Sequence, residues 1–274
     1  MREITSPTNP LIKVFRHSLK AGVTREGWLA CEGPLLLQEA VAASRGGGEK
    51  RRAECGCAVR SVLVAHSAAG KFADLLAQIP PDAEIAGTPD AVFDGAAATV
   101  SPQGIAALIE VTPPPLDRVL NLPGVILVAV LGLQDPGNLG TILRSADALG
   151  ADALITLKPT VSAHNPKILR ASGGALFRLP VYPALAAEPL FARLRGAGVR
   201  LAATDSHSHR SIAGAALCGP LAFVIGNEAA GLPIDIPADD RVAIPLRGGI
   251  DSLNAAVAAG VFLYESARQR GFRY

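Results

Sequence analysis

The chain has 274 residues, of which 49% are hydrophobic and 18% charged, and its formal net charge is +2. This length and composition predict a well-packed protein of one large or two ordinary domains and exclude a disordered chain. The longest strongly apolar run, residues 125–133, is too short to cross a bilayer, and residues 1–13 lack the apolar region of a signal peptide. We therefore expect a cytoplasmic protein.

The cysteines and two histidines are the candidate metal ligands. Cys55 and Cys57 form a C-x-C, but no second pair stands at zinc-ligand spacing, so reduced thiols are expected. His207 and His209 lie in a Ser/His-rich turn that lacks further ligands nearby, and we interpret this turn as a solvated loop. No metal is expected.

Basic residues are concentrated toward the two ends of the chain. Residues 1–60 carry ten Lys and Arg against six Asp and Glu, residues 61–111 carry one against six, and residues 112–274 carry fifteen against twelve. Such an excess suits a phosphate-rich partner such as nucleic acid, whereas ordinary solvated charges give a similar pattern. Charge alone leaves both interpretations open.

The first part of the chain has the pattern of a small α/β domain. A helix is predicted to start near Pro34, and the glycine- and charge-rich residues 46–52 predict a mobile loop. A strand over residues 59–65 and a helix over residues 68–78 should follow.

Three consecutive prolines, residues 113–115, mark a boundary, because proline cannot continue a helix or a central strand. Residues 112–124 are predicted to be a linker between a domain at 1–111 and a second domain at 125–274. In the second domain, five apolar runs with the length of buried parallel strands alternate with helical segments, which predicts a three-layer α/β sandwich. The runs are residues 124–133, 152–157, 199–205, 221–226 and 241–246. A terminal helix over residues 252–270 has apolar or small residues on all sides and should be buried.

Three of these strands end in polar turns that contain glycine: LGLQDPGNLG, VIGNEAAGLP and IPLRGGIDSLN. Because ligands bind at the carboxyl ends of parallel strands, the three turns are expected to converge on one site. The alternative is that they are ordinary turns in which Asn138 and Ser252 are helix N-caps. Their glycine spacing matches neither the dinucleotide fingerprint nor the Walker loop.

Arg144 follows the first turn on a helix, three residues before Asp147. It forms either a surface ion pair with Asp147, worth on the order of 0.3 kcal/mol, or a ligand contact at the rim of the site. Spacing alone does not choose between these two roles.

Three segments together resemble a known family. QDPGNLGTILRSADALGAD, LAFVIGNEAAGLP and IPLRGGIDSLNAAVAAGVFLYE are similar, in order and spacing, to the three motifs of SpoU-type (TrmH-type) RNA 2′-O-ribose methyltransferases of the SPOUT superfamily. RASGGALFRLPV resembles the segment that joins the second and third strands of that family. SPTNPLIKVFRHSLK and EGPLLLQEAV resemble its L30e-like substrate-binding domain. The resemblance covers nearly the whole chain.

This resemblance implies S-adenosylmethionine as the cofactor, a pocket formed by a trefoil knot near the C-terminus, and a homodimer with the active site at the subunit interface. It implies cofactor binding by the main chain of Gly226, Ile244, Leu246 and Leu253. The residues that match catalytic or acceptor-holding positions are Arg144, Asn138, Glu228, Ser252 and Asn254.

In the first domain, the candidates for phosphate contacts with RNA are Asn9, Lys13, Arg16 and Lys20, although solvated helix charges are as good an interpretation for each residue singly. The implied substrate is RNA, with large-subunit (23S) ribosomal RNA favoured and transfer RNA as the alternative. A non-catalytic RNA-binding protein on the same scaffold is a second hypothesis. A nucleotide-dependent oxidoreductase is disfavoured by the missing dinucleotide fingerprint.

The implied reaction aligns a ribose 2′-oxygen behind the methyl group of a sulfonium, and alignment requires no metal. In this family the matching arginine is proposed as the base. Because a guanidinium stays charged in water, phosphate binding and stabilisation of the 2′-oxyanion are the more favourable roles for Arg144.

Overall fold

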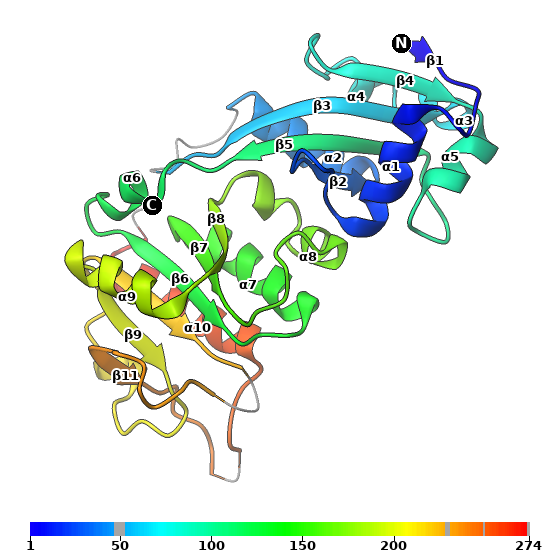
Figure 1. The fold of residues 1–274 in the computed structure, drawn as a ribbon. Coiled ribbons are helices and arrows are strands. Elements are labelled where there is room, and N and C mark those ends of the chain that lie inside the picture. Colours follow the sequence, from blue (N-terminus) through cyan, green and yellow to red (C-terminus); the bar gives the residue numbers. More distant parts are fainter. Residues whose placement is uncertain (47–52, 228–230, 249, 273–274) are drawn as a thin grey trace. The chain divides into compact units, whose positions relative to one another are not determined.

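The computed structural model describes residues 1–46, 53–227, 231–248 and 250–272 (Figure 1). The described chain divides into two compact units. The first unit consists of residues 1–46, 55–112 and 164–178, and the second of residues 53–54, 113–163 and 179–272.

The first unit contains a five-stranded mixed sheet in the order β1-β4-β3-β5-β2 (Figure 1). Strands β1, β4 and β3 run parallel, and β5 pairs antiparallel with both β3 and β2. The strands are β1 (Arg2–Glu3), β2 (Leu29–Glu32), β3 (Gly56–Ala65), β4 (Glu84–Thr88) and β5 (Ile105–Thr112). The helices are α1 (Pro10–Ala21), α2 (Pro34–Ser44), α3 (His66–Ala69), α4 (Ala73–Leu76), α5 (Asp90–Ala96), α8 (Pro166–Ala171) and the 3-10 turn η1 (Ala175–Phe177).

Most elements predicted in this unit are confirmed, with one exception. Helix α2 begins at Pro34, and β3 includes the expected strand. The single helix expected over residues 68–78 is wrong: α3 ends before Gly70, and α4 begins after Phe72, whose backbone is not helical. The Phe72 side chain is buried at this break, and we attribute the break to this tertiary packing, which overrides helix propensity. Apart from Gly46, the predicted mobile loop at 46–52 lies outside the described residues.

The second unit contains a six-stranded sheet in the order β11-β9-β10-β6-β7-β8, and every pair in it is parallel (Figure 1). Its strands are β6 (Ile126–Leu131), β7 (Ala153–Leu157), β8 (Val181–Leu185), β9 (Arg200–Thr204), β10 (Leu221–Ile225) and β11 (Asp240–Val242). Four predicted strands are confirmed, and the fifth, expected over residues 241–246, ends already at Val242. Edge strand β8 was not among them, because it contains Pro183 and is half exposed, unlike a buried parallel strand.

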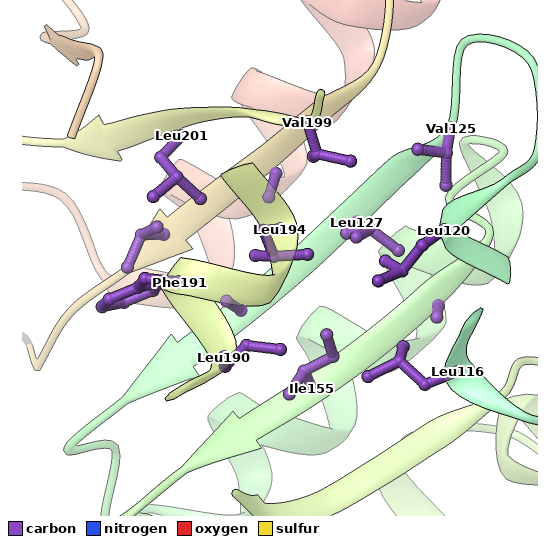
Figure 2. Close-up of a cluster of buried hydrophobic side chains, with 14 of the residues drawn as sticks. Leu116, Leu120, Val125, Leu127, Ile155, Leu190, Phe191, Leu194, Val199 and Leu201 are labelled. Carbon is purple, nitrogen blue, oxygen red and sulfur yellow. The ribbon is translucent and has the colours of Figure 1, made fainter. Parts of the chain in front are cut away.

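Helices cover both faces of this sheet, as the α/β sandwich prediction requires. Helix α9 (Ala187–Gly196) places Leu190, Phe191 and Leu194 against one face, where they meet Leu127 of β6 and Ile155 of β7 (Figure 2). Successive strand residues point to opposite faces, and Phe223 of β10 meets Phe262 of α10 (Ala255–Gln269) on the other face, at 5.7 Å between ring centroids. Helix α7 (Pro136–Ala148) packs beside α10.

The predicted linker at residues 112–124 contains a helix, α6 (Leu116–Leu120), that belongs to the second unit. The prolines end at its N-cap, Pro115, and Leu116, Val119 and Leu120 share the i, i+3, i+4 spacing of one helical face. All three are buried in the core shown in Figure 2. The segment is therefore a packed element.

Residues 164–178, which the sequence assigned to the second domain, pack within the first unit. Ile168, Leu169 and Phe177 are buried there, and α8 packs against α1 and β2. The segment lies between β7 and β8 in the sequence, and both strands belong to the second unit. Its packing in the first unit depends on tertiary contacts, which local sequence periodicity does not predict.

Helix α10 buries one face and exposes the other. Ala259, Phe262 and Leu263 are buried, whereas Val257 and Tyr264 are 54% and 52% exposed. The prediction of a helix buried on all sides is therefore wrong for a single chain.

Within the described residues, no helix combines the length and apolar character needed to cross a membrane.

None of the four cysteines forms a disulfide. Burial raises the pKa of the Cys31 thiol to about 12, so this side chain stays protonated and unreactive at neutral pH.

Candidate functional site

A pocket of about 290 Å³ lies at the carboxyl ends of β9, β10 and β11, beside the start of α10. Its volume is close to the lower end of the range of about 300–1,000 Å³ that small-molecule sites occupy. Apolar and polar groups share its wall. The lining residues are Thr204, Asp205, Ser206, His207, Ile225, Gly226, Asn227, Gly231, Leu232, Val242, Ile244, Leu246, Asp251, Ser252, Leu253, Ala255, Ala258 and Phe262.

Gly226, directly after β10, allows the chain to turn back tightly along the pocket. The Gly231 N–H donates to the Asn227 carbonyl at 2.9 Å. A Cβ atom on residue 226 would lie only 2.5 Å from the Gly231 carbonyl oxygen. Only glycine allows this approach, so Gly226 lets Gly231 pack directly against the end of β10.

The third polar turn supplies another part of the lining. Ile244 and Leu246 follow β11, and Ser252 and Leu253 precede α10, and all four line the pocket. The predicted cofactor-binding residues Gly226, Ile244, Leu246 and Leu253 are therefore brought together at one place.

The turn after β9 forms a further wall that the site prediction missed. Asp205 accepts hydrogen bonds from the His207 N–H at 3.0 Å and from Arg241 Nη1 at 3.3 Å, which fixes the turn beside β11. His207 is exposed and lines the pocket. The sequence could have indicated this wall, because Asp205 follows a predicted parallel strand and therefore lies at the same sheet edge as the other turns.

The first polar turn lies outside the lining but is hydrogen-bonded to the two turns that form it. Asn227 Nδ2 donates to the Gly132 carbonyl at 3.1 Å, and Asn254 Nδ2 donates to Asn138 Oδ1 at 2.9 Å. The expected convergence of the three turns is thus present, with the second and third at the pocket and the first at its edge. Glu228 lies outside the described residues.

The alternative interpretation, in which Asn138 and Ser252 are helix N-caps, is wrong. Asp135 caps α7, and its carboxylate accepts from the N–H groups of Gly137 and Asn138 at 3.2 and 3.0 Å. Asn254 caps α10. The side chains of Asn138 and Ser252 are therefore not needed to begin these helices.

Asn254 has two structural tasks that substitution can separate. Its Oδ1 accepts from the Ala256 and Val257 N–H groups, while its Nδ2 holds Asn138. We expect Asn254→Ala to cost about 0.5–2 kcal/mol of stability through loss of the cap. Asn254→Asp keeps the acceptor but loses the donor, so it should unfold like wild type in thermal melts.

If the activity that the family resemblance implies is present, both Asn254 variants should lower methyl transfer, because both lose the hydrogen bond to Asn138 Oδ1. Parallel measurement of thermal midpoints and of label transferred to RNA checks this. Wild-type turnover in Asn254→Asp would contradict a positioning role for the bond between the two asparagines.

Arg144 is exposed on α7, outside the pocket lining. Its side chain makes no hydrogen bond or ion pair with any other described residue, Asp147 included. The surface ion pair that spacing allowed is therefore not formed, and the guanidinium is available to a ligand.

The four predicted RNA-contact residues lie on or beside α1 in the first unit, and two of them have structural tasks. Asn9 caps α1 by accepting from the Leu11 N–H at 2.9 Å, and Arg16 Nε donates to the Gly95 carbonyl at 2.9 Å. Lys13 and Lys20 are exposed.

Comparison with known proteins places this geometry in a family. Residues 125–264 match the model of the SpoU rRNA Methylase family, which is slightly more than half of the chain. The chain belongs to the SpoU rRNA methylase family. The match spans the whole pocket, including the turn after β9 that the motifs alone did not identify.

Two curated relatives and one solved structure show how far the likeness to SpoU proteins extends. A protein of Synechocystis sp., named as an uncharacterized tRNA/rRNA methyltransferase, is 34% identical over 97% of this chain and 94% of its own. The 23S rRNA (uridine(2479)-2′-O)-methyltransferase of Streptomyces viridochromogenes is 36% identical over 68% of each chain. The crystal structure of the SpoU methyltransferase AviRb from Streptomyces viridochromogenes, in complex with the cofactor AdoMet, superposes with a TM-score of 0.78 and 28% identity, covering 96% of this chain and 98% of that one.

Proposed function

We propose that this protein transfers a methyl group from S-adenosylmethionine to a ribose 2′-hydroxyl of RNA, with 23S ribosomal RNA as the favoured substrate. The observation that carries the proposal is the pocket built by the second and third family motifs, with the first motif hydrogen-bonded at its edge. The names of the relatives support ribosomal RNA, and transfer RNA stays the alternative because one relative is named for both. A cytoplasmic location suits either substrate.

The residues of the pocket fit S-adenosylmethionine. Ile244, Leu246 and Leu253 offer apolar contacts, while Gly226 leaves room for a ligand to approach the main chain. When bound, S-adenosylmethionine supplies an electrophilic methyl group on its sulfonium. The trefoil knot that the family resemblance implies stays a prediction.

Arg144 is assigned to the acceptor RNA. Its unpaired, exposed guanidinium suits a phosphate group and a 2′-oxygen that gains negative charge as its proton leaves. Asn138, held by Asn254, and Ser252 at the pocket wall would orient the acceptor ribose. Glu228, which matches a catalytic or acceptor-holding position of the family, stays a predicted site residue.

We also propose a homodimer, supported by the exposed apolar face of α10. Val257, Val261 and Tyr264 lie at i, i+4, i+7 spacing on this face, and the Tyr264 ring packs on Phe272 with ring centroids 5.7 Å apart. A second copy of the chain would bury this stripe.

Val257→Glu and Tyr264→Glu are expected to convert the dimer into monomers with reduced methyl transfer, because each places a charge in the buried interface. Light scattering after size-exclusion chromatography measures the mass. Val100→Glu is the matched control, since Val100 is fully exposed in the first unit. A monomeric wild-type protein with full activity would contradict the dimer.

Incubation with methyl-labelled S-adenosylmethionine and unmodified ribosomal or transfer RNA tests the proposed function. Label should enter ribosomal RNA and depend on intact protein. Absence of label from both RNAs would contradict the proposal and favour a non-catalytic RNA-binding protein.

A further inference from the structure

Helices α1 and α8 are distant in the sequence but pack together in the first unit. Gly22 ends α1 with φ +89°, and a Cβ atom there would lie 1.7 Å from the His164 carbonyl oxygen, two residues before α8 begins. Pro166, the first residue of α8, is also within contact distance of this point. The end of α1 and the start of α8 are therefore held in close backbone contact.

The two packed segments are basic and contain no acidic residue. Residues 4–25 include Lys13, Arg16, Lys20 and Arg25 without any Asp or Glu. Residues 164–178 include Lys167, Arg170 and Arg178, again without any Asp or Glu. In the whole chain, by contrast, 26 Lys and Arg are almost balanced by 24 Asp and Glu. The contact between α1 and α8 thus brings two basic segments together, while α5 (Asp90–Ala96), which carries Asp90 and Asp94, also packs on α1.

Four exposed cations on the two helices have no side-chain partner among the described residues, whereas exposed Arg25 lies beyond α1 and next to Glu26. Lys13 and Lys20 of α1 and Lys167 and Arg170 of α8 make no side-chain hydrogen bond or ion pair with any other described residue. Other cations of the same segments have structural tasks, because Arg16 bonds the Gly95 carbonyl and Arg178 pairs with Glu39.

The spacing of these four residues along their helices places each pair on one helical face. Lys13 and Lys20 lie seven residues apart on one face of α1, with exposed His17 between them. Lys167 and Arg170 lie three residues apart on α8. Lys20 in the last turn of α1 and Lys167 in the first turn of α8 flank the backbone contact at Gly22.

We infer that Lys13, Lys20, Lys167 and Arg170 form one surface, the α1–α8 basic surface, that binds the phosphate backbone of the RNA substrate. Exposed ammonium and guanidinium groups bind phosphates by displacing counterions. Such contacts position RNA without reading its sequence. The inference rests on the proposed function only in taking RNA as the partner.

The test replaces the α8 pair (Lys167→Gln with Arg170→Gln), the α1 pair (Lys13→Gln with Lys20→Gln), or all four residues in the full-length protein. Binding of transcribed, unmodified 23S ribosomal RNA is measured over a range of salt concentrations without S-adenosylmethionine. Each pair should weaken binding and lower the slope of log affinity against log salt by about 1.4 for single-stranded or 1.8 for duplex contacts. The quadruple variant should lose about twice that slope.

Lys71→Gln is the matched control, because Lys71 is an exposed lysine of the same unit outside both segments. It should leave the slope unchanged, and thermal melts should show that all variants fold. An α8 pair with the wild-type slope would overturn the surface, whether or not the α1 pair matters. Titration of S-adenosylmethionine keeps the two proposals apart: wild-type protein that binds RNA through this surface but binds no S-adenosylmethionine would contradict the proposed function alone.

Discussion

Arg144→Ala is expected to reduce methyl transfer by about 10²–10³-fold, the usual cost of removing a group that stabilises a developing oxyanion. Arg144 is exposed and lies outside the pocket lining, so its loss should change neither folding nor the affinity for S-adenosylmethionine. Single-turnover transfer of label to RNA, together with calorimetric titration of the cofactor, separates the chemical step from binding.

A conservative variant and a control sharpen this test. Arg144→Lys keeps the charge but loses the planar fork of the guanidinium, so it should recover only part of the rate. Arg118→Ala removes another exposed, unpaired arginine of the same unit and should behave like wild type. Unchanged turnover in Arg144→Ala would remove Arg144 from the site.

Gly226→Ala is expected to weaken S-adenosylmethionine binding roughly ten-fold or more, because the overpacking strain is about 1–3 kcal/mol. The added methyl group would meet the Gly231 carbonyl at 2.5 Å and the Leu232 Cγ atom at 2.8 Å. Both neighbours line the pocket, so the return of the chain at residues 231–232 must move. Calorimetric titration of the cofactor measures the effect directly.

Gly214→Ala is the matched control for this substitution. A Cβ atom at Gly214 meets nothing within 4 Å, its φ is not positive, and the residue lies outside the pocket lining. It should bind the cofactor like wild type. Equal affinities in the two glycine variants would show that the close approach at Gly226 does not shape the cofactor site.

The sequence predicted the elements whose formation depends on local pattern. Buried parallel strands such as β6 and β10 are continuous apolar runs, and their polar turns marked the edge of the sheet where the pocket lies. The start of α2 could also be predicted from the sequence, because proline is favoured in the first turn of a helix.

Other features depend on contacts between distant residues and were missed for that reason. Residues 164–178 join the first unit through burial of Ile168 and Phe177, which no local periodicity encodes. The turn after β9 is held at the pocket by the hydrogen bonds of Asp205 with Arg241 and His207. These bonds are not visible in the sequence, where the Ser/His-rich turn has the pattern of a solvated loop. The exposed face of α10 carries residues as apolar as those of its buried face, so composition could not distinguish the two faces.

The position of the transferred methyl group tests the central claim most directly. Ribosomal RNA labelled by the wild-type protein is digested to nucleosides, and the labelled nucleoside is identified by mass spectrometry. The proposed role of Arg144 at the acceptor ribose predicts a 2′-O-methyl nucleoside, absent when Arg144→Ala replaces wild type. Label in a base-methylated nucleoside, or in no nucleoside, would contradict the account.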